Sequence, residues 1–180
     1  YHFMDCWPWL TDNNGQVDPG LFISDKLHLN DQGNQILGRF IAEAIRNSYL
    51  DEQTLDAFVD QWHLAAAMAD SADYFGAFYN EQSIFQGTDG GEYWTAGEFL
   101  AWAAPYFRRE SAWTFEAFER HWYRTGNTLW FNERLDSPHM GKCRGVGVVR
   151  ATSNGLKIDH YSLSFEVPNE VVGELVPLAT

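Results

Sequence analysis

The sequence predicts an α+β fold in which helices come first and a run of antiparallel strands follows. Up to about residue 107, apolar side chains recur at helical spacing. From Trp113 onward, short alternating segments are separated by turns rich in Gly, Asn and Pro, which is typical of β-hairpins. With 180 residues, 45% of them hydrophobic, the chain has enough material for a packed core. We therefore expect helices packed on one face of a strongly curved antiparallel sheet.

The charge balance is strongly acidic. Twelve Lys and Arg against 25 Asp and Glu give a formal net charge of −13, which would repel phosphate backbones and anionic lipid headgroups. We therefore expect no nucleic acid and no membrane as a partner, and no apolar run approaches the roughly 18 residues that a membrane span needs. The two cysteines, Cys6 and Cys143, are too few for a disulfide framework, which favours a reducing compartment and a cytoplasmic protein.

The first 50 residues differ in pattern from the rest. Residues 1–10 are aromatic and predict a strand, residues 11–15 and 19–20 are turn clusters, and residues 36–45 carry apolar side chains at helical spacing. Such a strand-loop-helix segment is too small to bury a core alone. We expect it to be a separate unit, residues 1–50, placed before a domain that covers residues 51–180.

Helices open the second domain. Residues 54–70 place apolar side chains on one helical stripe, and a second helix is expected at residues 71–79, followed by a short strand at 83–87. Thr95 and Glu98 form a capping box that predicts a helix running toward Phe107, which Pro105 should bend or shorten. The strands expected after these helices are residues 113–124, 128–135, 142–151 and 156–165, joined by turns at 125–127, 136–141 and 152–155.

An acid three residues before a histidine marks the loop before the first helix. Asp25 could orient the imidazole of His28, whose other ring nitrogen would act as a general base. The stretch resembles the last block of SGNH (GDSL-type) esterases, Asp-x-x-His-x-Asn-x-x-Gly, which implies that Asp25 and His28 are the acid and base of a catalytic triad. The family's Gly-Asp-Ser nucleophile block is absent from these residues, so we expect esterase activity only if an upstream part supplies it.

Residues 51–180 resemble the SnoaL-like branch of the nuclear transport factor two-like superfamily. The resemblance is carried by residues 85–89, 94–107, 130–133, 143–148 and 157–165. It implies a cone of helices and curved sheet that often encloses a ligand pocket. It does not imply one activity, because the superfamily includes isomerases, cyclases, dehydratases and non-catalytic binding proteins.

Strand alternation predicts which side chains face the interior of the cone. If Phe131 points inward, so does Glu133, and the same parity applied to the other strands brings Arg120, Arg144 and His160 to that face. A buried Glu needs a cation, so at least one Arg should contact Glu133. The expected pocket residues are Trp62, Arg120, Trp122, Phe131, Glu133, Arg144 and His160. The cluster fits a structural ion-pair network as well as a ligand-orienting site.

Several functions follow from this reasoning. The first is a domain that binds a small, partly apolar molecule, or an accessory module that dimerises; the second is an isomerase, cyclase or hydrolase that uses Glu133, His160 and the arginines. The six histidines show no His-x-His or His-Glu-x-x-His grouping, so we expect no metal and no cofactor.

The outer face of the sheet predicts a homodimer. By the same alternation this face carries Trp130, Tyr161, Leu163 and Phe165, which is more apolar area than a monomer usually exposes. The alternative is that residues 1–50 cover the face.

Overall fold

The computed structural model describes residues 5–12, 14–48, 50–125 and 128–178, and the chain divides into two compact units, Tyr1–Asp51 and Glu52–Thr180. No helix among these residues combines the length and the apolar character that a membrane span requires.

The first unit contains two short 3-10 helices, η1 (Trp7–Trp9) and η2 (Pro19–Leu21), and one long helix, α1 (Asp31–Ser48). The strand expected at residues 1–10 is wrong for its described part. The side chain of Asp5 accepts a hydrogen bond from the backbone of Trp7, and Pro8 lies within the first turn, so the segment forms a 3-10 turn instead. Residues 1–4 of that prediction lie outside the described residues.

The second unit opens with α2 (Glu52–Ala67) and α3 (Ser71–Gly76), and α4 (Ala96–Ala103) follows the first two strands. The predicted capping box is present, since the hydroxyl of Thr95 accepts from the backbone of Glu98 while the Glu98 carboxylate accepts from the backbone of Thr95. Helix α4 ends two residues before Pro105, as expected, and a 3-10 turn, η3 (Tyr106–Arg108), comes next.

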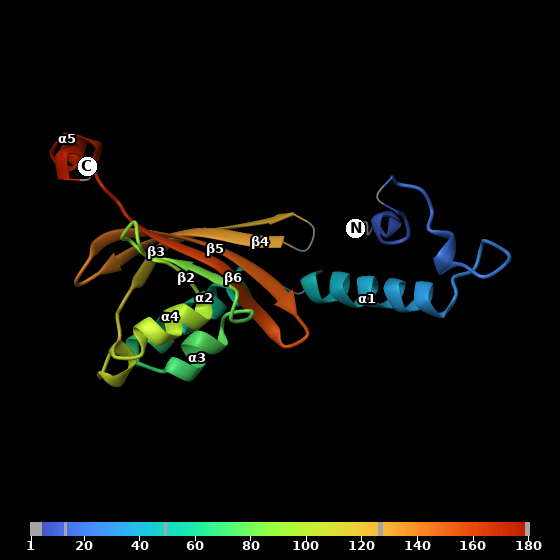
Figure 1. Ribbon diagram of the computed structural model, residues 1–180, viewed down its shortest axis with the longest axis horizontal. Helices are drawn as coiled ribbons and strands as arrows, with labels where there is room; N and C mark the ends of the chain where they lie inside the picture. Colours follow the sequence, from blue (N-terminus) through green and yellow to red (C-terminus); the bar gives the residue numbers. More distant parts are fainter. Residues whose placement is uncertain (1–4, 13, 49, 126–127, 179–180) are drawn as a thin grey trace. The chain divides into compact units, whose positions relative to one another are not determined.

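Six strands form one sheet in the order β2-β1-β6-β5-β4-β3. Their bounds are β1 (Ile84–Gln86), β2 (Tyr93–Thr95), β3 (Glu116–Thr125), β4 (Thr128–Ser137), β5 (Gly141–Thr152) and β6 (Gly155–Phe165). Helices α2, α3 and α4 gather on one side of the curved sheet (Figure 1). The predicted α+β cone is therefore confirmed.

The sheet differs from the prediction in two details. It is mixed rather than purely antiparallel, because β1 pairs in parallel with β6, and β2, which the sequence analysis missed, pairs with β1. Three short elements end the chain, η4 (Asn169–Val171), α5 (Val172–Leu175) and η5 (Val176–Leu178). The tip of the predicted turn between β3 and β4, residues 126 and 127, lies outside the described residues.

A β-bulge in β6 overturns the parity predicted for that strand. Val148 pairs with His160 but Val149 pairs with Ile158, so Asp159 is an extra residue on β6. Ile158 is buried on the inner face, and beyond the bulge the next buried residue is Tyr161, whereas His160, which was expected on the inner face, lies on the other face. Leu163 is buried for the same reason.

The parity predicted for β5 is also wrong. The buried positions are Cys143, Gly145, Gly147 and Val149, so Arg144 lies on the outer face. The prediction placed Arg144 on the inner face, but the inward positions opposite Glu133 and Phe131 are the glycines Gly145 and Gly147.

Candidate functional site

Glu133 is the centre of a buried polar cluster on the inner face of the sheet. Its carboxylate is completely buried, and Arg120, directly opposite on β3, donates to Oε2 from Nε at 3.0 Å and from a terminal nitrogen at 2.8 Å. The other carboxylate oxygen of Glu133, Oε1, accepts a hydrogen bond from Tyr161 Oη at 2.8 Å and lies 2.8 Å from Nε2 of His63 on α2. The expected Arg contact with Glu133 is therefore confirmed.

Glu133 is held ionised by these partners. Burial by itself raises the pKa of the carboxyl group, but His63 and Arg120 outweigh that effect and leave the pKa below its ordinary value. The same environment raises the pKa of Tyr161 well above its usual range, chiefly through burial and then through the charge of Glu133. Tyr161 is thus a neutral hydrogen-bond donor.

The ionised carboxylate determines the tautomer of His63. An ionised Glu133 can only accept hydrogen bonds, so Nε2 of His63 must carry a proton. The other nitrogen, Nδ1, makes no hydrogen bond to the described residues, and it is not among their buried polar atoms without a partner. In the neutral imidazole, Nδ1 therefore has a free lone pair that is accessible.

Arg120 links Glu133 to the carboxylates of α2. It donates to Asp56 Oδ1 at 3.1 Å and to Asp60 Oδ1 at 2.9 Å, and Asp56 also accepts from the indole of Trp122 at 2.9 Å. Phe131 is fully buried beside them, with its ring 4.7 Å from that of Trp122. The arginine is thus fixed from both sides, by the sheet and by the helix.

Two glycines on β5 make room for this cluster. A Cβ atom at Gly145 would overlap the hydroxyl of Tyr161 and crowd Glu133 Oε1, and one at Gly147 would overlap the ring of Phe131. Both glycines are paired with β4 directly opposite these residues, Gly145 with Glu133 and Gly147 with Phe131. The close approach of side chains to backbone therefore requires glycine at these two positions.

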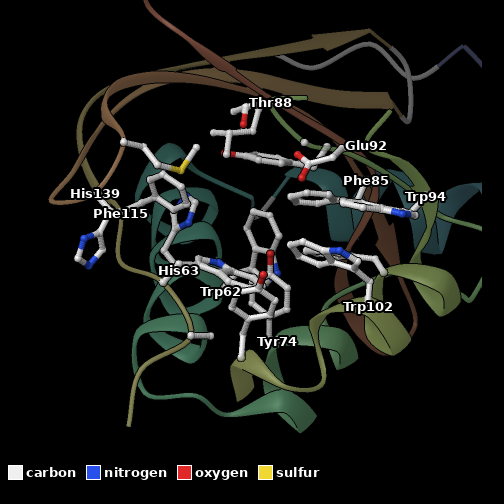
Figure 2. Close-up of a pocket in the computed structure, with 18 of the residues that line it drawn as sticks. Trp62, His63, Tyr74, Phe85, Thr88, Glu92, Trp94, Trp102, Phe115 and His139 are labelled. Carbon is white, nitrogen blue, oxygen red and sulfur yellow. The ribbon is translucent and has the colours of Figure 1, made fainter. Parts of the chain in front are cut away.

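A pocket of about 270 Å³ lies beside the cluster, and His63 forms part of its wall. In Figure 2 the flat rings of Phe85, Trp94 and Trp102 lie on one side, and His63 with Phe115 lies on the other. Thr88 and Glu92 are at one end of the pocket and Trp62 and Tyr74 at the opposite end (Figure 2). The lining is mainly aromatic, so the pocket suits an apolar ligand.

Trp62, which lines the pocket, carries a buried donor without a partner. Its Nε1 is the one buried side-chain nitrogen or oxygen among the described residues that lacks a hydrogen-bond partner. The ring is held by Tyr74, stacked at 5.0 Å between centroids, and by Tyr161, edge-on at 4.7 Å. A buried N–H group left without an acceptor costs about 1–3 kcal/mol.

Five of the seven predicted pocket residues lie in the pocket wall or in the Glu133 cluster, and two lie elsewhere. Trp62 lines the pocket; Arg120, Trp122, Phe131 and Glu133 form the cluster behind His63. Arg144 and His160 are not part of either group. Arg144 pairs with Glu166 at 3.1 Å on the outer face, and His160 lies on that face after the bulge.

His63 is the main residue that sequence analysis missed. It occupies a position on the buried stripe of α2, four residues after Val59 and eight after Leu55. A polar residue at an apolar helical position signals a buried partner, and this signal was available in the sequence.

The first unit brings Asp25 and His28 together. Asp25 Oδ2 lies 2.7 Å from His28 Nδ1, and Asp25 Oδ1 accepts from the backbone nitrogens of Leu27 and His28. These hydrogen bonds lower the pKa of Asp25, and the one from the backbone of His28 has the largest effect. The loop is braced by Asn30, whose side chain donates to Gly20 O at 2.7 Å.

No group of three or more His, Cys, Asp or Glu side chains within the described ranges could hold a metal ion. Cys6 and Cys143 are both free thiols, and burial raises the pKa of Cys143, which makes it a poor nucleophile.

Comparison with known proteins identifies the family of the second unit. A family model described as a SnoaL-like domain matches residues 55–168. The chain belongs to this SnoaL-like family. A search of curated proteins gave no match. The match begins after the first unit, so the resemblance of residues 1–50 to esterases has no support from it.

Solved structures share the fold of the SnoaL-like domain. An NTF2-like protein of unknown function from Pseudomonas putida KT2440 is 11% identical, with a TM-score of 0.54 over 67% of this chain and 89% of that one. A candidate ketosteroid isomerase from Parabacteroides distasonis is 12% identical, with a TM-score of 0.54 over 67% and 91%. A candidate dehydratase of the NTF2-like family from Streptomyces avermitilis is 17% identical, with a TM-score of 0.54 over 64% and 96%. At these identities the likeness shows the fold alone.

Proposed function

We propose that the SnoaL-like domain binds an apolar small molecule in its aromatic pocket and that His63 transfers a proton to and from that molecule. The observation that carries the proposal concerns His63, which lines the pocket. Its Nε2 lies 2.8 Å from the fully buried carboxylate of Glu133. A carboxylate that holds one ring nitrogen leaves the other to act as a general base.

The proposed step needs only the residues of the pocket. Nδ1 of His63 removes a proton from a carbon next to a carbonyl group, and Glu133 stabilises the imidazolium that forms. The proton returns from His63 to the bound enolate, either to the same carbon or to a second position, which gives exchange or isomerisation.

Two of the similar structures are named as a candidate ketosteroid isomerase and a candidate dehydratase. Isomerisation and dehydration both move a proton at a carbon atom, which is the chemistry that His63 could supply. Of the functions expected from the sequence, ligand binding with isomerase-type chemistry is therefore the one we favour, with His63 in place of His160.

The test is exchange of the α-protons of a two-ring ketone, 2-tetralone, in heavy water, followed by proton NMR. We expect the protein to accelerate exchange, His63→Gln to lose at least about tenfold of that acceleration, and His121→Gln to lose none. His121 is a matched control, since it also lies beside a carboxylate, Glu119 at 2.9 Å, but on the exposed surface. Equal rates of proton exchange with the wild type and with His63→Gln would contradict the proposal and indicate that the cluster is only a structural ion-pair network.

The outer face of the sheet supports a further proposal, that two copies pair through it. Tyr123 and Trp130 stack there at 5.7 Å, and Tyr123 and Val146 are exposed. The face is less apolar than the sequence predicted, because Tyr161 and Leu163 are buried on the other side and Phe165, opposite Cys143, shares that side. Light scattering at micromolar concentration should give twice the monomer mass for the wild type and the monomer mass for Trp130→Glu. A wild-type monomer would contradict the proposal.

A second candidate function concerns the first unit. The contact of 2.7 Å between Asp25 and His28 favours the acid and base of an esterase whose nucleophile lies outside these 180 residues. The 180 residues alone should hydrolyse 4-nitrophenyl acetate no faster than background. Hydrolysis that appears when an upstream segment with a Gly-Asp-Ser block is joined, and disappears in His28→Ala, would support this function. Continued inactivity of the joined protein would count against it.

A further inference from the structure

We propose that the molecule bound in the aromatic pocket carries a carboxylate and that Arg109 binds it. This inference rests on the proposed function, because it specifies the charge of the ligand that the same pocket takes. It depends on where the charged groups of the pocket lie and on which of them already have partners.

Arg109 lines the pocket immediately after η3 and makes no ion pair with any described residue. Its guanidinium lies over the ring of Tyr106, with Cζ 4.5 Å from the ring centroid. Stacking on an aromatic face orients the planar guanidinium and leaves its N–H edge free. Two parallel N–H groups on such an edge match the two oxygens of a carboxylate.

Four arginines of the sheet differ from Arg109 in this respect. In a chain of net charge −13, carboxylates outnumber cations, and four arginines of the sheet each pair with one or more of them. These arginines are Arg120, Arg134, Arg144 and Arg150. An arginine beside an apolar pocket that pairs with none of the described carboxylates is therefore available to a ligand.

The acidic residue of the pocket is less available than Arg109. Oε2 of Glu92 accepts a hydrogen bond from the backbone of Asp89 at 3.2 Å, which ties the carboxylate to the loop between β1 and β2. Glu92 would also repel a second carboxylate at its own end of the pocket. The charged group that can meet a ligand is thus the cation, and the ligand class is an apolar acid, such as an aromatic carboxylate.

The experiment compares two probes of the same shape by isothermal titration calorimetry with the whole 180-residue protein. The probes are 2-naphthoate, which is charged, and 2-naphthamide, which is not. We expect the wild type to bind naphthoate at least about tenfold more tightly than the amide, since an ionic hydrogen-bonded pair at a partly exposed site contributes about 1.4 kcal/mol or more. Arg109→Gln should lose about that factor for naphthoate and none for the amide.

The neighbouring residue provides the control. Arg108→Gln removes the same charge one residue away, at an exposed position that does not line the pocket, and should leave both affinities unchanged. Arg109→Lys keeps the charge without the planar fork and should fall between the wild type and Arg109→Gln. Circular dichroism would check that each variant is folded.

The outcomes separate this inference from the proposed function. If both probes bind equally and Arg109→Gln changes neither affinity, the ligand charge is wrong while the pocket remains a binding site. If Arg108→Gln weakens naphthoate as much as Arg109→Gln does, the effect is general electrostatic attraction and the assignment to Arg109 fails. If neither probe binds the wild type, the proposed pocket itself is contradicted.

Discussion

Replacing Glu133 by Gln should strongly destabilise the SnoaL-like domain. The carboxylate accepts two hydrogen bonds from Arg120 and one each from His63 and Tyr161, whereas a Gln side chain has only one oxygen to accept them. The NH₂ group of the Gln would face either the donors of Arg120 or those of His63 and Tyr161, and the negative charge that balances Arg120 would be lost. Removing one partner of a buried ion pair costs about 3–5 kcal/mol.

Such a loss is easy to measure. For a domain of this size, 1 kcal/mol corresponds to roughly 3–5 °C in melting temperature, so the Glu133→Gln variant should melt about 10–20 °C below the wild type. Thermal unfolding followed by circular dichroism at pH 7 provides the measurement. Glu119→Gln is the control, because its carboxylate pairs with Arg134 and His121 on the exposed face, so its loss should change the melting temperature little. A Glu133→Gln variant that melts within about 2 °C of the wild type would refute the reasoning.

Three other predictions follow from the same geometry. The pKa of Glu133 in the folded domain lies below its ordinary value of 4.5, so the ionised carboxylate stabilises the fold above pH 4.5. This stabilisation is lost as the pH falls through the folded pKa. The difference in melting temperature between the wild type and Glu133→Gln should therefore narrow below about pH 4.5. Gly145→Ala should cost about 1–3 kcal/mol in urea unfolding through overlap with Tyr161, whereas Gly76→Ala, with open space around its Cβ, should cost less than about 0.5 kcal/mol. Arg144→Ala should cost less than about 1 kcal/mol in the same assay, since the arginine is exposed, and a larger loss would place it back among the residues that hold the core.

The sequence was sufficient for the elements whose signals are local. The capping box at Thr95, the hairpin strands and the facing pair of Arg120 and Glu133 all follow from spacing within a few residues or across one turn. Burial of a carboxylate demands a cation, so a contact between Glu133 and at least one arginine could be predicted without coordinates; that it is Arg120 and not Arg144 depends on the parity of β5.

The parts that could not be predicted depend on contacts far apart in the chain. His63 and Glu133 are separated by 70 residues, and only the packing of α2 on the sheet brings them together. The parallel pairing of β1 with β6 likewise joins segments that have no common turn. The parity of β6 failed because a single bulged residue is invisible in an alternating pattern, and that of β5 failed because glycine has no hydrophobic signal.

The bulge at Asp159 also bears on how such a domain can change its chemistry. If β6 lost this bulge but kept Asp159, Asp159 would pair with Val148 and the rest of the strand would shift by one position, so that His160 would take the place of Tyr161 opposite Phe85 and beside Glu133. The buried wall would then exchange a neutral phenol for an imidazole while the preceding strands kept their sequence. The register of this one strand, and not only the identity of its residues, therefore decides which side chain of β6 faces Glu133.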